Sequence, residues 1–201
     1  MNMEKGNFVW QSSIPHLNKN KIDGVALHHM HHPTADEYEV EKWHLDNGWL
    51  GFGYNWWIGF DGHIVEGRGW RRPAGVKGFN DTVLSIGFQG GYEPTDKFEC
   101  TTVMPAAQFN AGVQLIKWLK PQLPKLQKTA GHNYWNATSC PGTYFPLDEM
   151  IHAAEDTKTP WEIIDWLKEK GILSDTQYWK NAVSIVKHLD KLFENIYERM
   201  G

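Results

Sequence analysis

The sequence predicts an α/β (α+β) domain, a mixed central β-sheet flanked by helices, followed by a C-terminal helical appendage. Three features indicate this architecture. Over residues 22–155, short apolar or aromatic segments bounded by Gly, Pro and Asn alternate with segments whose apolar residues recur at helical spacing. The polar run at 157–160 then has the composition of a linker, and two amphipathic helical patterns follow it. We therefore divide the chain into a domain of residues 1–156 and a helical segment of residues 157–201.

The expected strands are short. Residues 1–21 form a polar lead-in with little regular structure. Residues 22–27 are an apolar run that predicts a buried strand ending at His28. Residues 54–60 form an aromatic strand, which the tight-turn pair Asp61-Gly62 joins to a partner strand at 63–66. Residues 82–89 predict a further strand, closed by two glycines.

The expected helices have recognisable ends. Residues 34–47 predict a helix with Thr34 as N-cap and Glu37 completing a capping box. Residues 105–119 predict a second helix, with Pro105 near its first turn and Pro121 ending it. Residues 147–155 form the last helix of the domain. In the appendage, residues 161–171 and about 175–200 carry helical apolar faces that could bind a polymeric ligand, pair with another copy or pack on the domain.

Composition limits the classes of function. The chain has 201 residues, of which 41% are hydrophobic and 22% charged, as in soluble globular proteins. A net charge of -4 argues against nonspecific nucleic-acid binding. We expect no transmembrane helix, no signal peptide and, with two cysteines, no disulfide scaffold. The eleven tryptophans suit sugar stacking, although packing in the core accounts for such residues more often.

One stretch carries the residue types of a metal site. His132 and Cys140 stand eight residues apart, with Gly131 before the His and Pro141-Gly142 turning the chain after the Cys. A catalytic zinc usually has three protein ligands and a water, so a third ligand is needed, and His28 is the best donor. Such an ion lowers the pKa of the bound water toward about 7, which favours hydrolysis. The alternative is that His28 is a hydrogen-bonded core histidine and Cys140 a buried apolar thiol.

Several motifs occur in an order that resembles one known family, the zinc-dependent N-acetylmuramoyl-L-alanine amidases of type 2, which share their fold with peptidoglycan recognition proteins and several phage lysins. The resemblance covers residues 22–152. It is carried by Leu27-His28-His29, Gly53-Tyr54-Asn55-Trp56, Asp61-Gly62 with Glu66-Gly67-Arg68, Lys77-Gly78-Phe79-Asn80 with Ser85-Ile86-Gly87, Gly131-His132, and Thr138-Ser139-Cys140-Pro141-Gly142.

The resemblance implies a catalytic Zn²⁺ site. It implies His28, His132 and Cys140 as zinc ligands and Tyr54 as a hydroxyl near the metal-bound water. It places a Lys or Thr two residues before the Cys, where the side chain helps to stabilise the oxyanion, and here that residue is Thr138. Because a Thr hydroxyl carries no charge, we expect a smaller contribution than a Lys would make.

Substrate contacts are assigned with less support from the motifs. The expected set is His29, Trp57, Arg71, Lys77 and Asn80. Trp56 and Trp57 are neighbours on a strand, so they should face opposite sides, one in the core and one toward a groove. The cluster Arg68, Arg71 and Arg72 could grip acidic groups of a peptide stem, or form a solvated loop. Two positions depart from the family pattern: Gly75 replaces a His of many relatives, and Gln89 replaces a Glu that serves some relatives as general base.

The expected function is hydrolysis of the amide between N-acetylmuramic acid and L-alanine in bacterial peptidoglycan by zinc-activated water. We expect a phage or prophage endolysin or an autolysin, made in the cytoplasm and acting at the cell wall after release. The alternatives are a non-catalytic peptidoglycan-binding or recognition module and a cytoplasmic muropeptide-recycling amidase. Peptidoglycan is the expected partner, with no nucleic acid and no stable membrane insertion. A homo-oligomer formed through the C-terminal helices is a further possibility.

Overall fold

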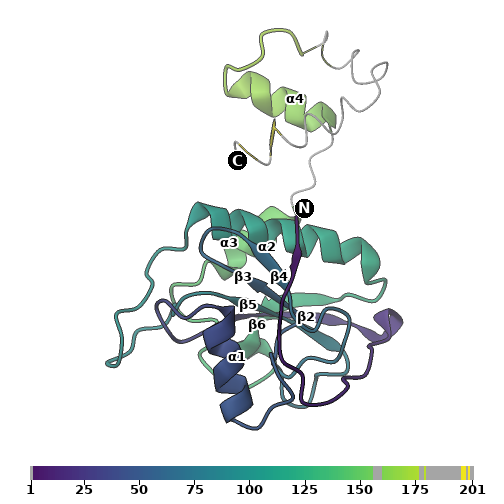
Figure 1. The fold of residues 1–201 in the computed structure, drawn as a ribbon. Helices are drawn as coiled ribbons and strands as arrows, with labels where there is room; N and C mark the ends of the chain where they lie inside the picture. Colours follow the sequence, from purple (N-terminus) through teal and green to yellow (C-terminus); the bar gives the residue numbers. More distant parts are fainter. Residues whose placement is uncertain (1, 156–159, 177–178, 180–195, 198, 200–201) are drawn as a thin grey trace. The chain divides into compact units, whose positions relative to one another are not determined.

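A computed structural model describes residues 2–155, 160–176, 179, 196–197 and 199 (Figure 1). The chain divides into two compact units, Met1–Glu155 and Asp156–Gly201. The first unit contains a mixed sheet, which in the described residues has six strands in the order β1-β4-β3-β5-β2-β6. The strands are β1 Glu4–Lys5, β2 Gly24–His29, β3 Trp56–Ile58, β4 Ile64–Glu66, β5 Val83–Phe88 and β6 Lys128–Gly131.

The centre of the sheet is built from parallel strands. β3 and β4 pair antiparallel, whereas β2 runs parallel to both β5 and β6. Every residue of β2 and of β5 is buried. Parallel strands covered on both faces have this near-continuous apolar sequence, which explains the short runs at 22–27 and 82–89. The predicted mixed sheet is therefore confirmed.

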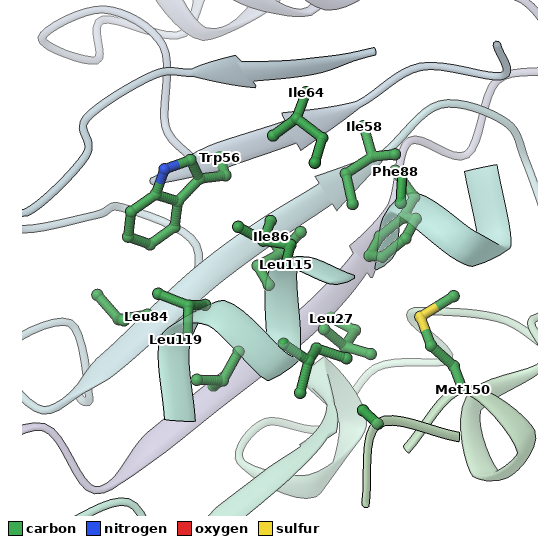
Figure 2. Packing of buried hydrophobic residues seen from close by; sticks show 14 of the residues in the cluster. Leu27, Trp56, Ile58, Ile64, Leu84, Ile86, Phe88, Leu115, Leu119 and Met150 are labelled. Carbon is green, nitrogen blue, oxygen red and sulfur yellow. The ribbon is translucent and has the colours of Figure 1, made fainter. Parts of the chain in front are cut away.

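Helices cover both faces of the sheet (Figure 1). α2 Ala106–Leu119 and α3 Leu147–Glu155 lie over one face, and α1 Glu37–Asp46 lies on the other. Figure 2 shows the larger core cluster, in which Leu115 and Leu119 of α2 and Met150 of α3 pack on strand residues such as Leu27 and Ile86. This packing gives β2 a fixed backing, so the opposite face of the strand can hold a site.

The second core cluster lies on the α1 side of the sheet. Trp57 packs there with residues such as Phe52 and Val40, while Trp56 belongs to the larger cluster on the other face. The two tryptophans thus face opposite sides, as the strand alternation predicts. Both are fully buried, so both contribute to the core and neither faces a groove.

The start of α1 and the strand β1 differ from the sequence expectation. α1 begins at Glu37 rather than near Thr34, because the Asp36 carboxylate accepts the backbone N–H groups of Tyr38 and Glu39, and Glu39 completes the capping box. Thr34 instead lies in the loop before α1, where its carbonyl accepts a hydrogen bond from the side chain of Gln89, the residue after β5. In the N-terminal lead-in, β1 adds a parallel edge to β4 that its polar sequence does not signal.

The second unit contains α4 Pro160–Glu169, within the segment predicted to be helical. Ile163, Ile164 and Leu167 on this helix are buried in a small apolar cluster of its own. Of the linker predicted at 157–160, Pro160 instead begins α4. The rest of that linker and most of the helix expected at about 175–200 lie outside the described residues. Within the described part of the chain, no helix is long and apolar enough to cross a membrane.

Candidate metal centre

Two of the three expected ligands arrive at the ends of neighbouring strands. His28 is near the carboxyl end of β2, and Leu27 pairs with Gly131, the last residue of β6. His132 follows immediately and begins a short 3₁₀ turn. Because parallel strands end at the same edge, the two imidazoles meet there, with ring centroids 4.5 Å apart. β6 is therefore the element that positions His132, and its short sequence, Lys-Thr-Ala-Gly, gave no strand signal.

Cys140 reaches the same place through a closed loop. The carbonyl of Cys140 accepts the backbone N–H of Asn133 at 2.8 Å, and its own N–H is donated to the hydroxyl oxygen of Thr138 at 3.2 Å. A side chain at Gly131 would collide with Pro141, since a Cβ there would lie 2.4 Å from the proline ring. The glycine thus allows the two ends of the loop to pack closely. The buried thiol of Cys140 lies with its sulfur 3.8 Å from Nδ1 of His28.

The geometry of these residues fits a zinc ion. The ligand atoms offered by His28, His132 and Cys140 all lie within 4.8 Å of one another. Tetrahedral coordination with ordinary zinc–nitrogen and zinc–sulfur bond lengths separates an N and an S ligand by about 3.6 Å, close to the separation observed between His28 and Cys140. Two imidazoles and one thiol also form a donor set that zinc prefers, and three protein ligands leave one coordination position for water or substrate.

The electrostatics of the site favour metal binding by the histidines. Burial lowers the pKa of His28 well below its usual value, and the neighbouring His132 lowers it further. Burial also lowers the pKa of His132. Both imidazoles are therefore neutral at pH 7 and have a lone pair for a metal. Burial raises the pKa of the Cys140 thiol to about 12 in the metal-free protein, so the thiolate requires a cation, and binding should release a proton.

A side chain that the sequence did not single out orients His132. Nε2 of His132 lies 2.9 Å from the amide oxygen of Asn136, which leaves Nδ1 for a metal. The amide nitrogen of Asn136 donates to the carbonyl of Lys77 at 3.1 Å. Ligand histidines usually donate their second N–H to such a partner, which fixes the tautomer and the ring. The position of Asn136, four residues after a candidate ligand, was the available signal.

Tyr54 lies beside the metal ligands. Its ring centroid is 5.2 Å from that of His28. The absence of a side chain at Gly87 makes this possible, because a Cβ there would lie 2.9 Å from the Tyr54 ring. Burial, and then the charge of Cys140, raises the pKa of Tyr54 above its usual value. The phenol therefore stays protonated and can donate a hydrogen bond.

Thr138 has a double connection to the site. Its hydroxyl oxygen accepts the N–H of Cys140, which holds the loop at the ligand. A hydroxyl that accepts one hydrogen bond still has a hydrogen to donate. The position is compatible with the oxyanion role that the resemblance implies, and it adds a part in shaping the loop.

Two of the expected substrate contacts are buried instead. His29 is 2% exposed, and its Nδ1 accepts the backbone N–H of Tyr92 at 2.8 Å. Burial, with a smaller effect of His31, lowers the pKa of His29 to about 3, so it remains a neutral acceptor. Trp57 is enclosed in the α1-side core. Both side chains support the fold around the site rather than presenting a surface to substrate.

The remaining expected contacts lie on the loop from Gly67 to Asn80. Lys77 is exposed and is tied to the centre through Asn136. The Asn80 side chain accepts the backbone N–H of Val76 and so shapes the loop. The backbone of Arg71 forms an isolated antiparallel β-bridge with that of His16. The described contacts of Arg71 do not include the three ligand candidates.

Two neighbouring arginines and Gln89 have structural partners. Buried Arg68 donates to the carbonyls of Phe52 and Arg72. Arg72 pairs with Asp81. The Gln89 amide accepts the N–H of Phe60 and donates to the carbonyl of Thr34, so it ties the end of β3 to the loop before α1. Neither Arg68 nor Gln89 is free for substrate chemistry.

Comparison with known proteins identifies the family of the chain. Residues 18–143 match the family model described as N-acetylmuramoyl-L-alanine amidase. Peptidoglycan-recognition protein SC1a of Drosophila melanogaster is 36% identical over 140 residues, covering 62% of this chain and 70% of that protein. The N-acetylmuramoyl-L-alanine amidase of Homo sapiens is 28% identical over 145 residues, 64% of this chain and 24% of its own length.

Solved structures share the fold. An endolysin N-acetylmuramoyl-L-alanine amidase, LysCS from Clostridium intestinale, superimposes with a TM-score of 0.67 at 19% identity, covering 77% of this chain and 95% of that one. The bumblebee PGRP-SA superimposes with a TM-score of 0.62 at 27% identity, covering 75% and 93%. The relatives thus include both amidases and peptidoglycan-recognition proteins. With the family model matching more than half of its length, the chain belongs to the N-acetylmuramoyl-L-alanine amidase family of type 2, which shares the fold of the peptidoglycan-recognition proteins.

Proposed function

We propose that this protein is a zinc-dependent amidase that hydrolyses the bond between N-acetylmuramic acid and L-alanine in bacterial peptidoglycan. The observation that carries the proposal is the convergence of ligand atoms from His28, His132 and Cys140 within 4.8 Å. Zinc in such a site supplies a Lewis acid and a water of lowered pKa, which are the requirements of amide hydrolysis at neutral pH.

The residues around the centre suit the remaining tasks of the reaction. The neutral imidazoles of His28 and His132 and the thiolate of Cys140 would hold the ion, with Asn136 fixing the His132 ring. The protonated phenol of Tyr54 can donate a hydrogen bond to the substrate carbonyl or orient the attacking water. The Thr138 hydroxyl can donate a second hydrogen bond where negative charge develops on the carbonyl oxygen.

We further propose that the enzyme acts at the cell wall as a phage or prophage lysin or an autolysin. A muropeptide-recycling amidase is the alternative within the same chemistry. Purified sacculi and soluble muropeptides, offered as separate substrates, distinguish the two. A lysin should digest the polymer at a rate comparable to that on the fragments, whereas a recycling enzyme should act on the fragments alone.

A recognition module without catalysis is the second candidate. It is favoured by the identity to peptidoglycan-recognition proteins and by Gln89, whose amide cannot take a proton and is hydrogen-bonded to the backbones of Phe60 and Thr34. The complete set of three ligand candidates favours the enzyme instead.

The test is to incubate purified peptidoglycan with the protein and zinc, then identify products by mass spectrometry. The enzyme hypothesis predicts new L-alanine amino termini and intact glycan strands carrying free lactyl carboxylates. Binding to the wall without any new amino termini would support the recognition module and refute the amidase.

A further inference from the structure

Two buried polar atoms beside the metal centre lack a protein partner. Among the described residues, Nε2 of His28 and the hydroxyl oxygen of Ser85 are both buried and without a hydrogen bond. Buried polar groups in folded proteins are almost always paired, with protein or with an ordered water. Two such atoms near one candidate ligand therefore call for a common explanation.

The two atoms face the same point. Ser85 on β5 pairs with Ala26 on β2, and Gly87 pairs with His28, so the side chains of Ser85 and His28 lie on the same face of the sheet. Gly75 passes over this face. A Cβ on Gly75 would lie 2.5 Å from the Ser85 hydroxyl oxygen and 3.1 Å from Nε2 of His28, so both atoms are within 3.1 Å of one position. Any side chain at residue 75 would therefore collide with the Ser85 hydroxyl, and only a glycine lets the loop pack here.

The chemistry of a histidine ligand decides what Nε2 needs there. Nδ1 of His28 faces Cys140, so Nδ1 is the nitrogen directed toward the metal. A neutral imidazole that gives Nδ1 to a metal carries its hydrogen on Nε2, which must then donate. His132 has the amide oxygen of Asn136 for this purpose, whereas His28 has no described counterpart.

We propose that Ser85 is the positioning residue of the His28 ligand: its hydroxyl oxygen is joined to the Nε2 hydrogen of His28 through one bridging water. The hydrogen bond fixes the tautomer and the ring orientation of His28, so the ligand is preformed before metal binds. Gly75 leaves the Ser85 hydroxyl and Nε2 of His28 without a side chain pressed between them. This inference rests on the metal-dependent function proposed above.

Two separate measurements test the proposal: the zinc affinity of the protein and the exchange rate of the His28 ring N–H. Zinc affinity of the wild type, Ser85→Ala and Val83→Ala is determined by competition with a chromophoric chelator. Val83 is a buried residue of the same strand and the same face, so its truncation loosens β5 without touching a polar atom. Loss of an outer partner of a metal-bound histidine weakens metal affinity by about 10- to 100-fold, so Ser85→Ala should bind zinc that much more weakly. Val83→Ala should bind it as the wild type does.

Nuclear magnetic resonance of the zinc-loaded wild type gives a second measurement that needs no variant. The ring N–H of His28 should appear as a slowly exchanging resonance on Nε2, and it should exchange faster in Ser85→Ala. Wild-type affinity in Ser85→Ala, or a His28 ring N–H that exchanges as rapidly as an exposed one in the wild type, would overturn the role of Ser85. Cys140→Ala separates this failure from that of the proposed function. If the wild type binds zinc and Cys140→Ala does not, the metal site stands whatever Ser85 does, and if the wild type binds no zinc, both proposals fall.

Discussion

The sulfur of Cys140 lies 3.8 Å from Nδ1 of His28, although 112 residues separate the two in sequence. His28 comes from β2, the neighbour of the edge strand β6, and Cys140 comes from a loop closed late in the chain. Their proximity, together with His132, turns two separate sequence motifs into one donor set. The predictions below test the groups that hold this set in place and those that act beside it.

Thr138 should contribute to turnover more than to metal binding. Thr138→Ala removes a neutral hydrogen-bond donor from the position of the oxyanion, and we expect kcat to fall roughly 10- to 100-fold while zinc stays bound. Thr138→Ser keeps the hydroxyl and the hydrogen bond to Cys140 and is the matched control, which should retain most activity. Metal analysis and steady-state kinetics on soluble muropeptides measure both effects. Loss of zinc in Thr138→Ala would show that the residue serves the loop instead.

Asn136 should act on the metal through His132. Asn136→Ala removes the oxygen that faces Nε2 of His132, and we expect zinc affinity to fall about 10- to 100-fold. Asn136→Asp keeps an acceptor at the same place and should bind zinc at least as well as the wild type. The measurement is chelator competition at pH 7. Equal affinities in the wild type and the alanine variant would remove Asn136 from the site.

Gly87 should be essential to the position of Tyr54. A Cβ at Gly87 would lie 2.9 Å from the Tyr54 ring and 3.0 Å from that of Trp57, so Gly87→Ala must displace one of them. Overpacking of this kind typically costs about 1–3 kcal/mol of stability. We expect Gly87→Ala to lose activity as Tyr54→Phe does, with zinc retained in both. Wild-type turnover in both variants would show that Tyr54 takes no part in the reaction.

The metal-free protein should lose stability as the pH falls below 6.5. Burial lowers the pKa of His29 to about 3 and that of His44 to about 4, and both accept backbone N–H groups through Nδ1. Between these values and 6.5 the unfolded chain binds more protons than the native one. The free energy of unfolding therefore decreases with falling pH, by up to about 1.4 kcal/mol per pH unit for each histidine.

Urea denaturation of the metal-free protein at pH 7 and pH 5 measures this loss. His44→Gln cannot be protonated and keeps an acceptor for the N–H of Gly53, so its stability should change less between the two pH values. An equal change in the wild type and His44→Gln would show that His44 is not the group that titrates.

The sequence predicts the framework of this protein well because its signals are local. The buried parallel strands are continuous apolar runs, and the helix over residues 147–155 has the predicted bounds. β6 was not predicted because its four residues, two of them polar, are too few to show the alternation of apolar and polar residues that indicates a strand. Pairing with β2 makes them a strand. α1 begins later than expected because Asp36 offers a better cap than Thr34 once the tertiary structure places Thr34 against Gln89.

In the candidate site too, some residues have a local sequence signal and others depend on the tertiary structure. The motifs identify the three residues that the structure brings together, His28, His132 and Cys140. The residue that orients His132, Asn136, is identified by its distance to the ring, since its spacing of four residues from His132 was the only signal in the sequence. Trp57 was expected to contact substrate because of its residue type and its place on a strand. Whether a strand face is open or buried depends on the helices that cover the sheet, and α1 covers the face of Trp57.

The central claim is tested most directly by measuring zinc content and amide hydrolysis together in the wild type and in Cys140→Ala. The account predicts one zinc ion per wild-type chain and release of L-alanine amino termini from peptidoglycan. It predicts that Cys140→Ala keeps its fold, binds zinc weakly or not at all, and releases no amino termini above background. Hydrolysis at the wild-type rate by Cys140→Ala, or a zinc-free wild type that remains fully active, would contradict it.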